Sequence, residues 1–112
     1  MIETLLMNYL EDCLQVDVYF EIPKGKIEKY IVIEKTGGSE TDHVCDSTFA
    51  IQSYEDSLAE AAKLNQKVIE AMRDFETLDE ICECTLNSNY NYTDVEIKKY
   101  RYQAVFDITH YQ

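Results

Sequence analysis

Residues 56 to 75 read Asp-Ser-Leu-Ala-Glu-Ala-Ala-Lys-Leu-Asn-Gln-Lys-Val-Ile-Glu-Ala-Met-Arg-Asp-Phe, and they are the only long stretch of the chain with helical periodicity. Its apolar residues recur every three or four positions, the spacing that gathers them on one side of an α-helix. That side is formed by Leu58, Ala61, Ala62, Leu64, Val68, Ile69, Met72 and Phe75. Asp56 or Ser57 is expected to cap the first turn, and Glu60 follows Ser57 at the spacing of a capping box. The stretch therefore predicts a long helix that lays its apolar side on a second layer.

The segments on both sides of this helix predict the second layer, a β-sheet. Alternating or β-branched residues indicate strands, and apolar residues at helical spacing near the N-terminus indicate a short helix. In order, we expect a helix over residues 2–14, strands over 16–22, 29–36 and 43–54, the long helix, and strands over 81–92 and 97–111. Gly37, Gly38 and Ser39 are expected to end the second strand, because glycine pairs are typical of turns.

The fold class follows from this order. It is α+β: a helix, a three-strand meander, the long helix and a two-strand hairpin, with one curved, mainly antiparallel sheet packed on the long helix. The chain has 112 residues, which is the length of a single domain. We therefore expect one domain over residues 1–112, without an interdomain linker.

The charge balance narrows the classes of function. The chain has 22 acidic against 10 basic residues, a formal net charge of -12, so it would repel the phosphates of nucleic acids and anionic membranes. No apolar run approaches the roughly 20 residues that cross a bilayer. The first residues lack the basic region of a signal peptide. We expect a protein that stays in the cytoplasm of the cell that makes it.

The four cysteines, at positions 13, 45, 82 and 84, lack the two-residue spacing of a zinc knuckle. Cys82 and Cys84 are expected on one face of a strand, where they would start a soft-metal site only with help from His43 or His110. Reduced, mostly buried thiols are the better explanation in a cytoplasmic chain. We therefore expect no disulfide, no metal and no cofactor.

Candidate catalytic groups are few. His43 and Cys45 stand at same-face positions of a strand, but the sequence shows neither an orienting acid nor an oxyanion hole beside them. The carboxylates lie in runs that are typical of solvated surfaces. We therefore expect no enzyme. The 9 tyrosines, most of them in or beside strands, indicate either sheet packing or a subunit contact.

Several segments of the chain together carry a resemblance. They read Val18-Tyr-Phe-Glu-Ile-Pro23, Tyr30-Ile-Val-Ile-Glu-Lys-Thr-Gly-Gly-Ser39, Phe49-Ala-Ile-Gln-Ser-Tyr54, Ala61-Ala-Lys-Leu-Asn65 and Leu86-Asn-Ser-Asn-Tyr-Asn-Tyr-Thr-Asp94, followed by Tyr100-Arg-Tyr-Gln-Ala-Val-Phe-Asp-Ile108. In the residues of these segments and in their order along the chain, the protein resembles the tail-terminator, or tail-completion, proteins of long-tailed phages, in the form carried by prophages of Gram-positive bacteria. The resemblance covers nearly the whole chain, and its motifs are structural.

The resemblance implies a head-to-tail joining protein with no catalytic step. Such a subunit assembles as a ring, expected to be a hexamer, on the end of the tail tube, stops tube growth and presents the joining surface to the head. The implied partners are further copies of itself, the tail tube protein and a head-completion connector protein, first in the host cytoplasm and then in the virion. DNA would pass through the lumen without specific binding, and an acidic wall suits that passage.

Two loops are expected to make these contacts, because loops at the ends of a rigid sheet are free to meet neighbours. They contain Gly37, Gly38, Ser39, Glu40 and Asp42, and Asn89, Tyr90, Asn91, Tyr92 and Thr93.

Two alternatives from other classes stay open. One is an acidic inhibitor that imitates DNA and binds a basic host nucleic-acid-binding protein, although lysines interrupt the carboxylates of this chain. The other is a small oligomeric enzyme with its site between subunits, which no sequence feature supports.

Overall fold

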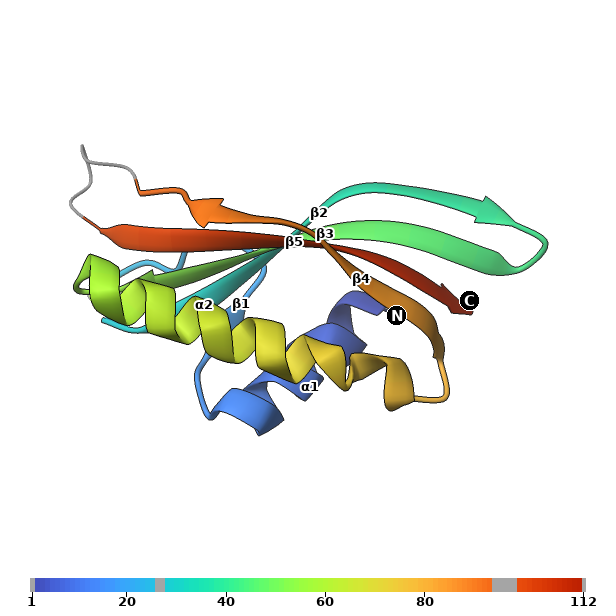
Figure 1. Cartoon of the computed structure of the whole chain (residues 1–112), viewed down its shortest axis with the longest axis horizontal. Coiled ribbons are helices and arrows are strands. Elements are labelled where there is room, and N and C mark those ends of the chain that lie inside the picture. The colour runs from blue at the N-terminus through green and yellow to red at the C-terminus, as the bar shows by residue number, and fades with distance from the viewer. Residues whose placement is uncertain (1, 26–27, 94–98, 112) are drawn as a thin grey trace.

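The computed structural model describes residues 2–25, 28–93 and 99–111. The elements follow in the order α1 (Ile2–Leu14), β1 (Val18–Tyr19), β2 (Tyr30–Thr41), β3 (Val44–Glu55), α2 (Leu58–Arg73), the 3-10 helix η1 (Phe75–Thr77), β4 (Ile81–Asn91) and β5 (Tyr100–Tyr111). The strands form one sheet in the order β1-β2-β3-β5-β4. Both helices lie on the same side of this sheet, and no described helix covers its other face (Figure 1). The α+β fold expected from the sequence is confirmed.

Antiparallel pairing joins β2 to β3, β3 to β5 and β5 to β4, so the last two strands form the expected hairpin. The expected three-strand meander is wrong in its first strand. β1 has only two residues, and Val18 and Tyr19 pair in parallel with Ile31 and Val32 of β2. Two parallel neighbours cannot be joined by a tight turn, because the chain must first travel back along the sheet before the second strand begins.

α2 is the helix that the sequence predicts, and a side-chain cap sets its start. Ser57 accepts a hydrogen bond of 3.2 Å from the backbone N–H of Glu60, which satisfies one donor left free in the first turn. The side of α2 that faces the sheet buries Ala61, Leu64, Asn65, Val68, Ile69 and Met72. Leu58 is 40% exposed, so its expected burial is wrong, because the first turn of α2 lies at the end of the sheet (Figure 1).

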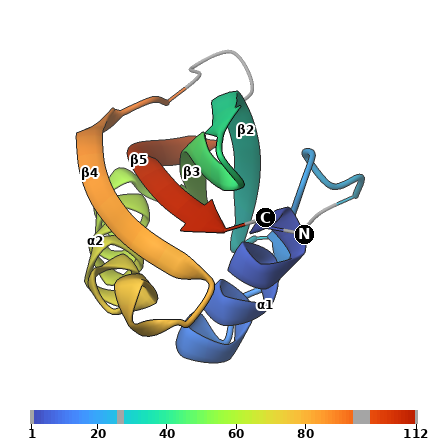
Figure 2. The same ribbon diagram turned by 90° about the vertical axis from the view of Figure 1, so that its right-hand side faces the viewer.

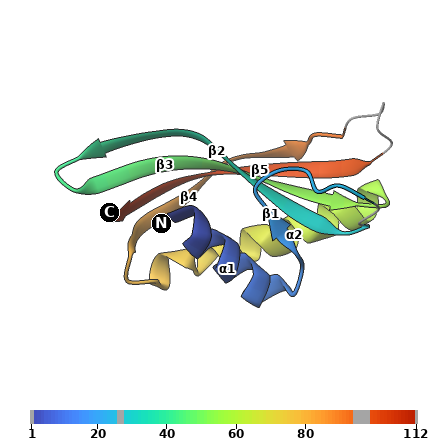
Figure 3. The same cartoon turned by 180° about the vertical axis from the view of Figure 1, so that it is seen from behind.

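The main core lies between the helices and the sheet. Its sheet side includes Ile31, Ile33, Phe49, Ile51, Ala104, Phe106 and Ile108, and α1 adds Leu6 and Leu10. Tyr9 of α1 contacts α2 and η1. Its hydroxyl donates a 2.5 Å hydrogen bond to the carbonyl of Ala71 in α2, and the centroid of its ring lies 5.0 Å from that of Phe75 in η1. The sheet curves around α2, with β4 at its outer edge (Figure 2), and α1 crosses beside α2 in the view from behind (Figure 3).

The hairpin between β2 and β3 turns at Asp42 and His43. Both residues have positive φ, 52° and 68°, and the flanking residues Thr41 and Val44 are a strand pair. A two-residue hairpin turn of type I′ needs positive φ at both central positions, and its twist matches that of the strands. The turn therefore lies beyond the double glycine.

The expected loop from Gly37 to His43 is wrong, because Gly37 and Gly38 lie inside β2. The register shifts between Lys35 and Gly37, and glycine lets a strand bulge and bend at such a point. Only the first part of β2 is central, since residues 34–41 are exposed and pair with β3 alone. Residues 37–46, which we call the arm, extend this hairpin along the sheet (Figure 1).

Candidate interaction surface

The structure separates the two segments expected to contact neighbours. The molecule measures 44 × 24 × 24 Å, and the arm lies at one end of its long axis. Residues 89–93 lie at the opposite end, beside the start of α2 (Figure 1). The structure therefore does not bring the two segments into a single site, and each can meet a different neighbour.

The end that carries the arm is acidic. Within the described residues its carboxylates come from three places: the arm, the connection from α2 to β4, and the facing parts of β4 and β5. They are Glu40, Asp42, Asp46, Asp74, Glu76, Asp79, Glu80, Glu83 and Asp107. The described cations nearest to them in the chain are Lys35 and Arg73. This end concentrates the charge excess that the composition shows.

The second expected contact segment is mostly strand. β4 continues to Asn91, close to the end of the strand expected over residues 81–92, and Asn89 pairs with Ala104 of β5. The expectation that Asn89, Tyr90 and Asn91 belong to a contact loop is therefore wrong. The Asn89 side chain also accepts a 2.5 Å hydrogen bond from Asn65 of α2, which fixes this end of β4 against the helix. The sequence also predicts a turn from Thr93 to Glu96 between the last two strands, and all of this turn beyond Thr93 lies outside the described residues.

The open face of the sheet carries a tyrosine cluster near this second end. The rings of Tyr30 and Tyr54 stack with centroids 4.6 Å apart and planes 13° from parallel, and Tyr19 meets Tyr30 edge to face. Burial, together with the neighbouring Tyr54, raises the pKa of the Tyr30 hydroxyl. Tyr54 and Tyr30 are buried, so these two rings pack within the sheet. Tyr90 and Tyr92 are more exposed and are the tyrosines of this end that a second molecule can reach.

A polar network continues this cluster across three strands. Gln52 accepts a 3.1 Å hydrogen bond from the Tyr54 hydroxyl and donates one of 2.9 Å to Gln103, and Gln103 donates in turn to the Tyr90 hydroxyl. Gln52 and Gln103 are buried although no helix covers this face. Buried amides need such partners, so the network fixes the register of β3, β5 and β4.

Arg101 is the cation at the centre of this surface. Its Nη1 donates to the Tyr54 hydroxyl at 2.9 Å, and its Nε donates to the Tyr92 carbonyl at 2.5 Å. The guanidinium carbon lies 4.3 Å from the centroid of the Tyr92 ring, which is cation–π geometry. The sequence alone places Arg101 on the solvent side of an alternating strand, and only the strand register brings it between Tyr54 and Tyr92.

Arg101 borders a groove on the open face, between the segment that follows β1 and the strands. The groove has a volume of about 380 Å³ and is lined by Phe20, Glu21, Ile22, Val32, Glu34, Gln52, Tyr54, Tyr92 and Arg101. Phe20 and Ile22 are 47% and 54% exposed, so the expectation that residues 20–22 belong to a strand is wrong. Apolar side chains around a few placed polar groups are typical of binding grooves. We call this feature the open-face groove.

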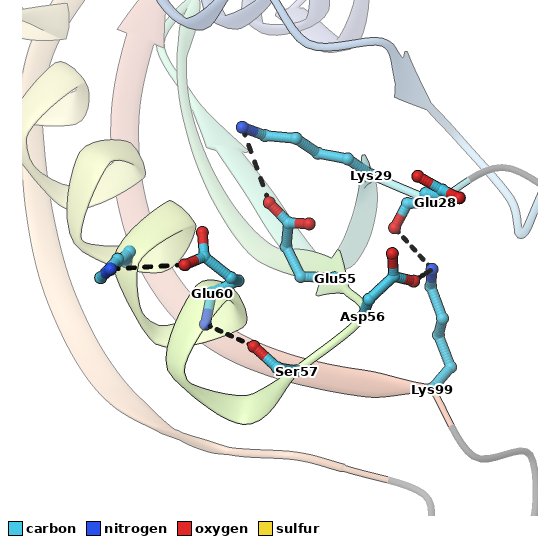
Figure 4. A network of polar contacts seen from close by, with 8 residues as sticks. Glu28, Lys29, Glu55, Asp56, Ser57, Glu60 and Lys99 are labelled. Atoms are coloured by element: carbon cyan, nitrogen blue, oxygen red, sulfur yellow. Dashed lines mark hydrogen bonds and ion pairs between the residues drawn. The ribbon is translucent and has the colours of Figure 1, made fainter.

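The lysines at this end are held by acidic partners. Lys29 lies 3.6 Å from the Glu55 carboxylate, and Lys99 lies 3.3 Å from that of Asp56 (Figure 4). Lys99 also donates a 2.5 Å hydrogen bond to the Glu28 carbonyl. These contacts tie the starts of β2 and β5 to the end of β3. Charges of both signs are thus present here, in contrast to the acidic arm end.

The candidate pair of His43 and Cys45 does not lie on one face of a strand, so this expectation from the sequence is wrong. His43 is in the turn, whereas Cys45 is opposite His110 in the strand register. Ser47 and His110 are joined by a 2.8 Å hydrogen bond, but both are buried in the described part of the chain. His110 Nδ1 faces the Tyr111 carbonyl, which only accepts, so the hydroxyl of Ser47 donates to Nε2. The pair ties β3 to β5.

The cysteines are less buried than expected. Cys13 and Cys82 are exposed, and Cys45 and Cys84 are half-buried. The strand register shifts at Cys82, whereas Cys84 pairs with Ile108 on the core side of the sheet. The expectation that the two cysteines lie on the same face of the strand is therefore wrong. Burial, with a smaller effect of Glu76, raises the pKa of Cys84 to about 12, which keeps this thiol protonated at neutral pH.

We expect four free thiols and no bound zinc in the purified protein, because the spacing of the cysteines predicts neither a disulfide framework nor a metal site. Within the described residues no group of three or more potential metal ligands lies together. Thiol titration of denatured, unreduced protein and elemental analysis measure both quantities. Fewer than four thiols, or one zinc ion per chain, would show this expectation to be wrong.

Comparison with protein-family models gives no match for this chain, and neither does comparison with curated proteins. No helix within the described residues is long and apolar enough to cross a membrane. The fold and surface define an elongated α+β protein with an uncovered sheet face, an acidic arm at one end and an aromatic groove with Arg101 towards the other.

Proposed function

We propose that this protein is a structural subunit of phage or prophage virion assembly. It caps the tail tube as a ring, hexameric as the resemblance implies, and joins the tail to the head. The observation that supports this proposal best is the placement of the arm and of residues 89–93 at opposite ends of the sheet. A subunit of a closed ring needs two different surfaces that point away from each other, because each copy meets one neighbour on each side.

The partners follow from the proposal. They are further copies of this chain, the tail tube protein and the head-completion connector protein, in the host cytoplasm and then in the virion. The acidic balance of the chain, a formal net charge of -12, suits a channel through which DNA slides, because phosphates are repelled there. The same charge keeps the acidic DNA-mimic inhibitor as the alternative proposal, with a basic host protein as its partner.

Replacing Tyr90 and Tyr92 by serine is expected to lower the yield of joined virions at least about tenfold, because exposed interface tyrosines each contribute about 1–2 kcal/mol to an association. Both side chains are 42% exposed at the β4 end. This double variant keeps the bond between Asn89 and Asn65 but removes the Tyr90 hydroxyl that accepts from Gln103 and the Tyr92 ring beside Arg101. Its thermal transition is therefore measured beside that of the unchanged protein, and only a folded variant is scored. Electron microscopy of lysates from a complemented deletion strain counts the joined particles.

Tyr100→Ser is the matched control, because Tyr100 is 39% exposed at the same end of the molecule but directly precedes Arg101 in β5 and so lies on the opposite face of the sheet from the tyrosine cluster. It should complement like the unchanged protein. Full complementation by the Tyr90 and Tyr92 variant would remove the proposed contact role of this end.

A further inference from the structure

We propose that the arm of one copy docks on the open-face groove of the next copy, with the carboxylates of Glu40 and Asp42 directed to Arg101. This inference rests on the proposed ring and names the surfaces that close it. The residues that line the groove lie outside the arm, so one elongated copy can use both surfaces at once. Such a contact is head to tail and can close into a ring.

The groove offers an incomplete site for an anion. Two of the five N–H donors of Arg101 are used inside the chain, by the Tyr54 hydroxyl and the Tyr92 carbonyl. The hydrogen bonds and the Tyr92 ring hold the guanidinium in place, which lowers the entropy that a carboxylate must overcome to bind it. Phe20 and Ile22 stand exposed on the opposite wall, where apolar contact excludes water from the ion pair.

The arm offers the matching group. Glu40 and Asp42 are exposed at the tip of a rigid two-stranded hairpin, and within the described residues neither has an ion pair in its own chain. A tight type I′ turn presents both carboxylates on a narrow tip. A groove of about 380 Å³ suits the side chains of such a tip. Charge complementarity therefore selects a second copy of this chain as the occupant.

The other charged residues of the groove determine where the carboxylates enter. Glu21 and Glu34 also line it and would repel the arm. Tyr54 pairs with Tyr30 on one side and with Arg101 on the other, so Tyr30 and Arg101 are at the same level of the sheet. Glu34 is four residues further along β2 and therefore lies away from Arg101. The arm is therefore expected to dock at the Arg101 end of the groove, where the tyrosine rings surround the cation.

Charge reversal on each surface tests the docking. One variant is Arg101→Glu and the other combines Glu40→Lys with Asp42→Lys. Each alone sets like charges against each other and is expected to lower the formation of rings on purified tail tubes at least about tenfold. An equimolar mixture of the two is expected to restore rings, because every contact between unlike copies again joins opposite charges. Ring formation is measured by electron microscopy and by the mass of the bound protein.

The control for the arm variant is Asp79→Lys with Glu80→Lys, which makes the same change in net charge at the same acidic end but outside the arm. It should form rings like the unchanged protein. If Arg101→Glu does not fold, Arg101→Gln replaces it as the groove variant, and the arm variant alone still tests the contact. Normal rings from the arm variant would overturn the docking. So would the absence of rings from the mixture of folded Arg101→Glu protein with the folded arm variant. Failure of the unchanged protein to form rings on tubes would instead overturn the proposed function.

Discussion

Val68→Asp is expected to unfold the domain. Val68 is fully buried on the side of α2 that packs on the sheet, so the new carboxylate would lie in the main core without a partner. An unpaired buried charge costs several kcal/mol, and the whole stability of a domain of this size is about 5–15 kcal/mol. Circular dichroism should show loss of the cooperative thermal transition.

Lys67→Asp is the matched control, because it introduces the same side chain one residue earlier in α2, at an exposed position. It should keep the cooperative transition within a few degrees of that of the unchanged protein. A thermal transition of Val68→Asp that equals that of Lys67→Asp would contradict the assignment of the α2 face that meets the sheet.

Deletion of the gene from an inducible prophage is expected to abolish joined virions. The lysate should contain filled heads and separate tails, with tubes of uncontrolled length, because the proposed ring both stops the tube and presents the joining surface. Electron microscopy of the lysate measures joining and tube length together. Expression of the unchanged protein from a plasmid should restore both.

Normal joined virions from the deletion strain would contradict the assembly proposal. A loss of joining with tubes of normal length would restrict the role of the protein to head attachment. Recovery of the protein in a tight complex with a basic host nucleic-acid-binding protein would favour the DNA-mimic alternative.

Local signals in the sequence were sufficient to predict α2 and its cap. The spacing of Leu64, Val68 and Met72 reports on a helix face, and Ser57 caps the first turn through the neighbouring Glu60. These interactions lie within one or two helical turns, so they can be recognised without knowledge of the tertiary fold. The alternation in β5 is local in the same sense, and it identifies Ala104 and Phe106 as core residues.

The turn between β2 and β3 could not be located in this way. A double glycine is the stronger turn signal, but the chain uses glycine for a bend inside β2 and turns at Asp42 and His43. Aspartate tolerates the left-handed conformation better than most residues, so the Asp42 position was a weak signal of the turn. The pairing of β2 with β3 continues to Thr41 and Val44, so the turn lies at Asp42 and His43 and not at the double glycine.

The groove residues could not be predicted because they depend on pairing between distant strands. Arg101 meets Tyr54 only because β5 inserts between β3 and β4 in the sheet. Gln52 and Gln103 look like solvent-facing residues in the sequence, and their burial follows from the same register. Sequence periodicity gives the face of a strand but not its neighbour.

The mass of the purified protein, measured alone and after addition of purified tail tubes, shows whether the protein forms a ring on the tube end. The proposed function predicts that a fixed number of copies, a hexamer according to the resemblance, binds at one end of each tube and stops its further growth. A protein that stays unbound and monomeric in the presence of tubes, while tube length continues to increase, would contradict it.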